Sequence, residues 1–247
     1  MKKLTSIAVS LILAIVLGSM LASDLYIPIE EEQERPLAIV RRFKPQVELA
    51  SGDKEFVLDL TQNLGERLFN GDTLSTDKDG YALVVFMDNT VAKVKPESML
   101  IVQGESLADS KISNRRISLE NGEVFMEVEP LGSGTFEVAT SRSLASVKGT
   151  RFGTRAYGYV WVQEGQVDVT ATNSGQTISL FEKMFASVDN TGSTIQSGTL
   201  TNEELSNLDE GFDELDEELI ERTIILKFRD ANGQIREIPV NIFEKGN

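Results

Sequence analysis

Between residues 75 and 197 the sequence is a series of short apolar runs separated by turn residues. The clearest runs are Tyr81–Met87, Thr90–Val94, Met99–Gln103, Glu123–Glu129, Thr135–Thr140, Tyr159–Gln163 and Gln166–Thr172. They are rich in Val, Phe, Tyr and Thr, and pairs such as Asp88-Asn89 and Asn121-Gly122 separate them, as is typical of strands and turns. Because no helical period is sustained across this region, it is predicted to be all-β.

Three segments in this region share one pattern of an apolar residue, polar residues, a Gly, a polar residue and then a strand. They are Leu68–Leu74, Leu119–Phe125 and Val162–Val169. A Gly at a fixed corner suits a chain that coils or rolls, since Gly adopts backbone conformations that other residues avoid. The pattern predicts a mainly β protein with a single rolled or solenoid-like domain over residues 37–198. A conventional sandwich with three independent Gly turns is the alternative.

The composition excludes several kinds of chemistry. The chain has no Cys and no His, which removes disulfides, thiolate nucleophiles, histidine-based catalysis and histidine-ligated zinc. Its net charge of −15 argues against nucleic-acid binding. The tightest basic group, Arg41, Arg42 and Lys44, is too small for that role and is interpreted as the solvated edge of an early strand. We expect no enzymatic activity, no cofactor and no metal.

The first residues predict export from the cytoplasm. Lys2 and Lys3 precede an uncharged stretch over residues 4–22, which as a helix would span about 28 Å, close to the ~30 Å hydrocarbon core of a bilayer. Residues 1–22 are either a cleaved signal peptide or a membrane anchor. Cleavage after Ala22 would place Met20 at position −3, which is a poor site, so the anchor is favoured. Residues 23–36 follow as an acidic tether, and the rest is expected on the periplasmic or extracellular face.

The last segment, residues 199–247, has a different composition. Residues 202–221 contain ten acidic residues and no basic one. Their apolar positions follow a spacing of three and four that predicts an amphipathic acidic helix, and they are Leu205, Leu208, Phe212, Leu215 and Leu219. Gly211 could divide this helix in two. Asn232-Gly233, between alternating apolar runs over residues 223–243, predicts a terminal β-hairpin.

The apolar stripe of the acidic helix is the candidate partner-binding element. The alternative is that the stripe docks on the chain's own β-domain while the acidic side chains face water. If the helix meets another protein, its negative field would select a basic partner.

Three motifs occur in order along the β region. They are a GD-x-L-x-T opening (Gly71, Asp72, Leu74, Thr76), an L-x-x-G-x-V step (Leu119, Gly122, Val124) and a V-x-GT-x-F strand (Val147, Gly149, Thr150, Phe152). Over roughly residues 65–190 this combination resembles the FecR domain family. The resemblance implies an all-β, non-catalytic domain located in the cell envelope. Its Gly residues would allow special backbone conformations, and its apolar positions would fill the core.

The best-known members of that family are membrane anti-sigma regulators that sense an outer-membrane iron-siderophore transporter. They carry a cytoplasmic sigma-binding module before the membrane segment, whereas only residues 1–3 precede the apolar stretch in this sequence. We therefore expect a FecR-domain envelope protein without that module. It would act as a non-enzymatic protein-interaction or signalling module whose partner is another envelope protein.

Two further features have competing interpretations. Asp77 and Asp79, followed by Gly80, have the spacing of a calcium loop, but a hairpin turn explains them better. Trp161, with Tyr157 and Tyr159 nearby, could stack on a sugar or pack on a strand face, and packing is favoured. The sugar interpretation motivates an alternative function, a structural or surface protein that binds cell wall or polysaccharide.

Overall fold

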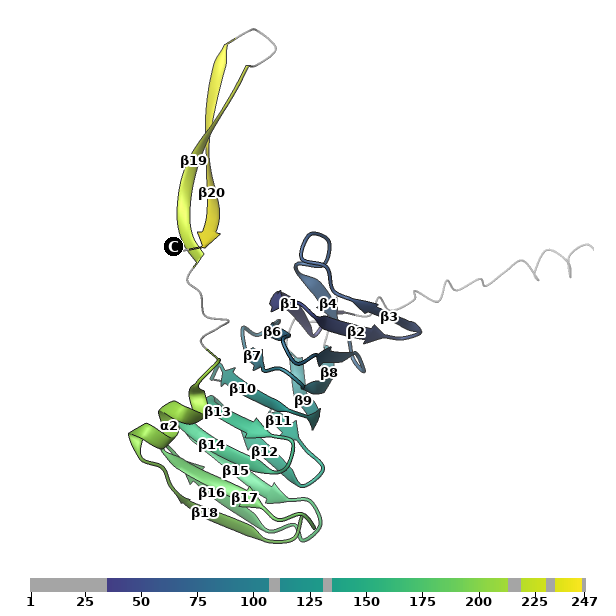
Figure 1. Cartoon of the computed structure of the whole chain (residues 1–247), viewed down its shortest axis with the longest axis vertical. Helices are drawn as coiled ribbons and strands as arrows, with labels where there is room; N and C mark the ends of the chain where they lie inside the picture. Colours follow the sequence, from purple (N-terminus) through teal and green to yellow (C-terminus); the bar gives the residue numbers. More distant parts are fainter. Residues whose placement is uncertain (1–34, 107–111, 131–134, 213–218, 230–233, 246–247) are drawn as a thin grey trace, which may run out of the picture. The chain divides into compact units, whose positions relative to one another are not determined.

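The computed structural model describes residues 35–106, 112–130, 135–212, 219–229 and 234–245 (Figure 1). Residues 35–212 form a body of eighteen strands and one helix, and the last two strands form a separate hairpin. The predicted signal peptide or anchor and most of the acidic tether lie outside the described residues. Within the described residues, no helix has the length and apolar character needed to cross a membrane.

The strands of the body form two nine-stranded sheets. In spatial order the first sheet comprises β18 (Ile195–Thr199), β17 (Met184–Val188), β14 (Tyr159–Glu164), β13 (Thr150–Arg155), β10 (Glu123–Val128), β7 (Val91–Val94), β6 (Tyr81–Phe86), β1 (Ala38–Lys44) and β4 (Glu66–Leu68). The second sheet comprises β16 (Thr177–Phe181), β15 (Gln166–Ala171), β12 (Ser143–Val147), β11 (Phe136–Ala139), β9 (Ile112–Asn121), β8 (Met99–Ser106), β5 (Thr73–Thr76), β2 (Val47–Ser51) and β3 (Lys54–Val57).

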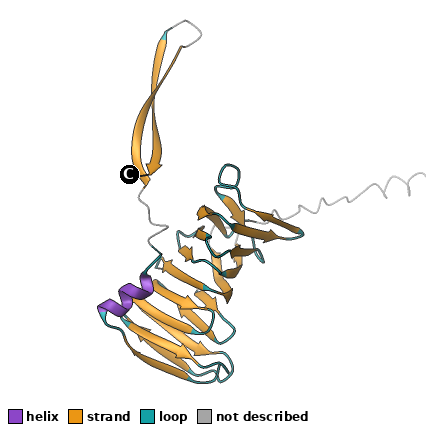
Figure 2. Ribbon diagram, in the orientation of Figure 1, coloured by secondary structure: helices purple, strands orange, loops and turns teal. Residues whose placement is uncertain are grey.

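Both sheets are built in nearly the same order as the sequence. The chain places one or two strands in one sheet, crosses to the other, and so advances along both layers together (Figure 2). The pairs are antiparallel except for β9 and β11, which are parallel. The prediction of a mainly β, rolled or solenoid-like domain is therefore confirmed. The structure also has a feature of the alternative, a sandwich. Its two sheets stack as layers, while the chain progresses along both of them as in a solenoid.

The main core lies between the two sheets and follows from strict alternation along the strands. In β6, Ala82, Val84 and Phe86 are buried, while the residues between them are only partly buried. Since successive side chains of a strand point to opposite faces, one face of each sheet supplies the core and the other faces outward. Phe86 and Phe136, one from each sheet, meet edge to face with ring centroids 5.3 Å apart.

A buried ion pair also ties the two layers together. Arg115 of β9 is only 2% exposed, and its guanidinium pairs with Asp88 in the turn between β6 and β7. Burial lowers the pKa of Arg115. Asp88 also accepts hydrogen bonds from the backbone N–H and the hydroxyl of Thr90. A buried cation needs such a partner, because an unpaired charge inside a protein is strongly unfavourable.

The basic group near the start of the body lies at an edge of the first sheet, in agreement with the interpretation from sequence. Arg41, Arg42 and Lys44 lie on β1, which pairs with β6 on one side. On the other side β4 is only three residues long and pairs with residues 38–40 alone, so the basic residues lie beyond that pairing. Arg41 is exposed, and Arg42 and Lys44 are partly exposed.

The single helix of the described residues, α2 (Asn202–Asp209), begins immediately after β18. Thr201 caps it in a capping box: its hydroxyl accepts from the backbone N–H of Glu204, and the Glu204 carboxylate accepts from the Thr201 backbone N–H at 2.8 Å. The prediction of a helix extending to residue 221 was wrong. Gly211 has a φ of +86°, which ends the helix, and residues from Leu219 onward pair as a strand.

The terminal hairpin is confirmed and is longer than the sequence suggested. β19 (Leu219–Arg229) and β20 (Ile235–Lys245) are antiparallel, with Leu219 opposite Lys245 and Arg229 opposite Ile235. The Asn232-Gly233 turn lies outside the described residues. Among the described residues of the hairpin, Ile225 and Ile235 are exposed.

Candidate functional site

The outward side of the first sheet carries a row of aromatic residues at one register. Phe185, Trp161, Gly153 and Phe125 lie opposite one another on β17, β14, β13 and β10. Val160 and Val162, on either side of Trp161 in β14, belong to the main core. The Trp161 side chain therefore points to the opposite, outward side of the sheet. Helix α2 covers this row and forms a second apolar cluster, which we call the aromatic face. It comprises Phe125, Trp161, Leu200, Leu205 and Phe212, with Tyr159, Phe185 and Leu208 packed against it.

Two glycines make room for the large rings. A Cβ on Gly153 would overlap the six-membered ring of Trp161, and a Cβ on Gly198 would lie 2.8 Å from Phe185 Cε1. Since Gly153 is paired with Trp161 and Gly198 with Phe185, each ring lies across the strand next to its own. As a result the Trp161 side chain is completely buried although it points away from the main core.

The end of α2 is fixed by a single carboxylate. Asp209 accepts hydrogen bonds from Trp161 Nε1 at 3.2 Å and from Gln163 Nε2 at 2.7 Å. Burial raises the pKa of Asp209, and the two hydrogen bonds oppose that effect. The helix is therefore held by apolar contacts along its length and by a half-buried polar contact at its C-terminal end.

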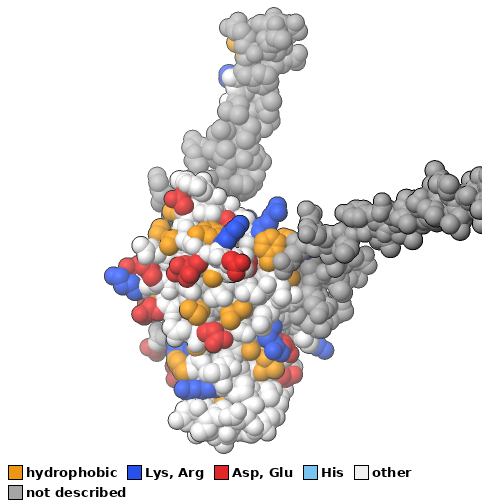
Figure 3. Space-filling view, turned by 90° about the vertical axis from the view of Figure 1, so that its right-hand side faces the viewer, with side chains coloured by type: hydrophobic (Ala, Val, Ile, Leu, Met, Phe, Trp, Pro, Cys, Tyr) orange, Lys and Arg blue, Asp and Glu red, His pale blue; other side chains and the backbone are white. Residues whose placement is uncertain are grey.

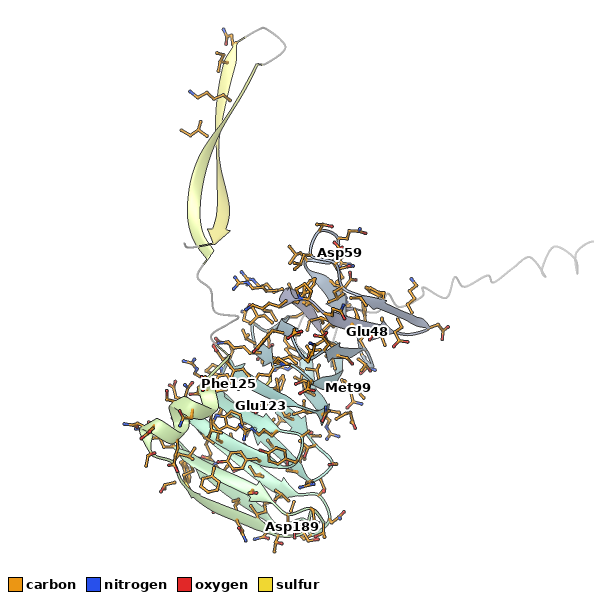
Figure 4. The ribbon with its side chains drawn as sticks, in the orientation of Figure 1. Glu48, Asp59, Met99, Glu123, Phe125 and Asp189 are labelled. Atoms are coloured by element: carbon orange, nitrogen blue, oxygen red, sulfur yellow. The ribbon has the colours of Figure 1, made fainter. Side chains whose placement is uncertain are left out.

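A charged cluster borders the aromatic face. Glu123 of β10 lies near Phe125 (Figure 4). Its carboxylate pairs with Lys95 Nζ at 2.8 Å and also with Arg155, while Lys95 Nζ lies 4.1 Å from the ring centroid of Phe212. Burial lowers the pKa of Arg155, but its hydrogen bonds to Tyr157 and Glu123 outweigh burial and the pKa is raised. The Arg155 guanidinium also lies 5.7 Å from the ring centroids of Tyr159 and Trp161. Lys95 and Arg155 thus lie beside the aromatic face on which helix α2 packs.

A groove opens beside this cluster, with a volume of about 470 Å³. Its lining includes Lys95, Glu97, Asn121, Arg155 and Tyr157. Tyr157 is half-exposed at the rim, and its hydroxyl accepts a hydrogen bond from Arg155 Nη1 at 2.9 Å. The groove is open, and three of its charged residues, Lys95, Glu123 and Arg155, pair with one another.

The five residues of the predicted partner-binding stripe do not share one environment in the structure. Leu205 and Phe212 are buried in the aromatic face, and Leu208 packs against it. Leu215 lies outside the described residues. Leu219 begins β19 rather than continuing the helix, so it does not belong to the same helical face. Partner binding by this stripe stays a prediction.

The comparison with known families settles the type of domain. Residues 72–168 match the family model described as FecR protein. These residues are a FecR domain. They run from the start of β5 through the first half of β15 and so include Gly153 together with Phe125 and Trp161 of the aromatic face, whereas Leu205 and Phe212 lie beyond the matched region.

Among solved structures, two crystal structures of a candidate anti-sigma factor from Parabacteroides distasonis are similar to this chain. Each has 22% sequence identity and a TM-score of 0.48 over 56% of this chain. The similarity spans 64% and 65% of those two chains, which is less than two thirds of their length. None of the curated proteins matches this chain.

The motif residues of the FecR domain have structural roles. Gly71, Gly122 and Gly149 have φ values of +90°, +81° and +146°, which other residues rarely adopt. Asp72 is buried and accepts a hydrogen bond from the backbone N–H of Phe69 at 2.7 Å. The apolar motif positions Leu74, Leu119, Val124, Val147 and Phe152 all lie in the main core, as predicted.

The other sequence candidates are also explained by local structure. Asp77 accepts a hydrogen bond from the backbone N–H of Asp79 at 2.9 Å, and Gly80 N–H donates to the Asp77 carbonyl, so this segment is a turn. No group of three or more acidic residues is placed to hold a metal ion within the described ranges. On the face shown in Figure 3, acidic, basic and apolar side chains are interspersed.

Sequence reasoning missed the residues that hold the helix. The sequence does not distinguish Asp209 from the other nine acidic residues between residues 202 and 221, and it gives no prediction for Lys95, Glu123 or Arg155. The alternation of Glu123, Phe125 and Glu127 within one strand was the available signal, because it places an aromatic residue between two carboxylates on one outward face.

Proposed function

We propose that this protein is a non-enzymatic component of the cell envelope whose FecR domain binds another protein and serves in signalling. The observation that supports this most is the FecR domain itself, which spans the middle of the body. The lack of Cys and His supports the non-enzymatic part of the proposal, as do the buried charged residues Asp72, Lys93 and Arg115, which take part in a turn and in ion pairs.

The proposed location follows from the sequence. An uncharged segment after Lys2 and Lys3, favoured as an anchor over residues 4–22, would hold the body on the periplasmic or extracellular side. N-terminal sequencing of the protein recovered from membrane and soluble fractions tests this directly. Recovery of the intact chain in the cytosolic fraction would contradict the proposal.

Partner binding is testable by photo-crosslinking in intact cells. A photoreactive phenylalanine analogue at Tyr157 would report on the groove beside the aromatic face, and the same analogue at Phe181, which is 54% exposed on β16 of the second sheet, is the control. A protein captured from position 157 and not from position 181 is the expected result. Equal capture, or no capture from either, argues against a specific partner at this face.

Wall or polysaccharide binding through Trp161 is not favoured. The indole is fully buried beneath α2, so it offers no open ring face on which a sugar could stack.

A further inference from the structure

The edge strands at the two ends of the body differ in charge. At one end β4 carries Glu66 and Arg67, and β3 carries Lys54 and Glu55. At the other end the sheets finish with β18 and β16, and neither of these two strands contains a charged residue (Figure 1). Charged side chains on an edge strand hinder its pairing with another chain, so the end formed by β16 and β18 lacks a protection that the other end has.

The hydrogen bonds at either end of the pair formed by β17 and β18 show which residues of β18 bond to β17. Beyond one end, the Leu200 N–H donates to the Lys183 carbonyl at 2.7 Å, and beyond the other the Asp189 N–H donates to the Thr194 carbonyl at 3.1 Å. In an antiparallel pair every second residue exchanges hydrogen bonds with the neighbouring strand. The residues of β18 that bond to β17 are therefore those at positions 196 and 198.

The other residues of β18 direct their backbone groups away from the sheet. The N–H and C=O groups of Ile195, Ser197 and Thr199 lie on the outer edge, and no strand of the described residues pairs with that edge. Ser197 and Thr199 are exposed. The N–H of Ile195 has one long hydrogen bond, to Gln176 Oε1 at 3.4 Å. The outer edge of β18 can therefore accept another strand.

The outer edge of β18 is complementary to itself. Two copies related by a two-fold axis at Ser197 would pair as antiparallel strands, with Ile195 of one copy opposite Thr199 of the other. In that register the outward backbone groups of both strands meet, which gives about six hydrogen bonds. Ile195 packs against the end of the main core and would become more buried. Because β18 has no charged side chain, the two paired strands would not repel each other.

We infer that two copies of this chain associate through β18, which joins their first sheets into one continuous sheet. A second copy fits this edge because the two-fold register gives every outward N–H of β18 a carbonyl acceptor on both sides of the interface. This self-association goes beyond the proposed function and does not depend on it. The net charge of −15 makes whole copies repel one another, so added salt should strengthen the association.

Disulfide trapping tests the register, because the chain has no Cys of its own. Residues that exchange hydrogen bonds across an antiparallel pair have Cα atoms about 5.5 Å apart, which suits a disulfide. The Ser197→Cys variant of the full chain, in a neutral detergent under mild oxidation, should therefore form a cross-linked dimer. The matched control is Ser141→Cys, which changes an exposed serine in the turn between β11 and β12 and should not cross-link.

Charge complementation tests whether residue 197 faces its own copy. Ser197→Lys and Ser197→Glu should each weaken self-association about tenfold or more, since two like charges then lie opposite each other. An equimolar mixture of these two variants should associate again, because each Lys then faces a Glu. Analytical ultracentrifugation of the full chain, at low and at high salt, measures the association of the parent, of each variant and of the mixture.

Three outcomes would overturn the inference. The first is a parent chain that stays monomeric at high protein concentration and high salt. The second is equal cross-linking of Ser197→Cys and Ser141→Cys, which would mean random collision. The third is failure of the mixed Lys and Glu variants to associate, because a different surface or a different segment would then occupy the edge of β18. The emission of Trp161, the only tryptophan, should be the same in all variants and so controls for misfolding.

Discussion

Gly153 and Trp161 are paired on adjacent strands, and the indole ring occupies the space in which a side chain at position 153 would begin. This relationship makes the aromatic face flat enough for α2 to lie on it. The helix then covers Trp161 completely, and Asp209 fixes its last turn. Because the chain contains one tryptophan, its fluorescence reports directly on this docking.

Replacing Gly153 with Ala should displace the indole. The added methyl group would overlap the ring, and such overpacking costs about 1–3 kcal/mol of unfolding free energy. Urea unfolding followed by circular dichroism measures the loss, and a shift of Trp161 emission shows where it arises. Gly104→Ala is the matched control, since its Cβ would meet its nearest neighbours at 3.5 and 3.6 Å without strain. Equal effects of the two changes would contradict this explanation.

Replacing Asp209 with Ala should loosen the end of α2. Trp161 Nε1 and Gln163 Nε2 both lose their acceptor, and leaving buried donors unsatisfied costs about 1–3 kcal/mol. The expected result is lower stability together with greater quenching of Trp161 by acrylamide. Glu210→Ala, at the neighbouring exposed position, should leave both measurements unchanged. If quenching in Asp209→Ala matches that of the parent, Asp209 does not fix the helix.

The fluorescence of Trp161 should change with pH as the carboxyl group of Asp209 gains or loses its proton. Burial raises the pKa of this carboxyl above its ordinary value of 3.8, so the docked state favours the protonated form. The stability that protonation of Asp209 adds to the docked state is fully present below that ordinary value and is lost as the pH rises through the raised pKa, while the hydrogen bonds that its carboxylate accepts from Trp161 and Gln163 remain above it. A fluorescence titration should therefore show a midpoint above 3.8 that disappears in Asp209→Asn. A midpoint that survives the substitution would assign the transition to another group.

Breaking the buried Arg115–Asp88 ion pair should lower the free energy of unfolding far more than breaking the exposed Lys78–Asp79 pair. Asp88→Ala leaves a buried guanidinium without its partner, and breaking a buried pair in this way costs about 3–5 kcal/mol. Asp79→Ala removes the partner of the exposed Lys78, and we expect a change of about 0–1 kcal/mol. Thermal unfolding of the two variants side by side makes the comparison. Similar melting temperatures would show that Arg115 does not depend on Asp88.

The strands were predictable because their information is local. In β6 each outward residue alternates with a core residue, and in β15 Val167, Val169 and Ala171 point inward at a period of two. The hairpin of β19 and β20 was predictable for the same reason, since the sequence pair Asn232-Gly233, a strong hairpin signal, stands between two segments that pair with each other. The motif glycines with positive φ reflect a local backbone requirement, although Gly122 and Gly149 also leave room for Ser98 and Pro130, which are more distant in the sequence.

The extent of the acidic helix was not predictable from its periodicity alone. Leu205, Leu208 and Phe212 fit the helical spacing and do face the sheet, but Leu219 fits it equally well and lies in a strand. The choice between helix and strand at residues 219–221 depends on their pairing with residues 243–245, which lie more than twenty residues further along the sequence. Long-range pairing therefore overrode the local pattern.

The sequence by itself determined the class of this protein: alternating strands, glycine corners, the absence of Cys and His, and motifs that identify a FecR domain. Only the tertiary structure decided what the outward face of the first sheet presents. Trp161 meets Asp209 across a strand and a helix that are far apart along the chain, and Arg42 and Lys93 lie in one row of the sheet with Leu83 between them. Alternation fixes which residues share a face within one strand, but neighbours across strands are set by the order of pairing, which no single segment encodes.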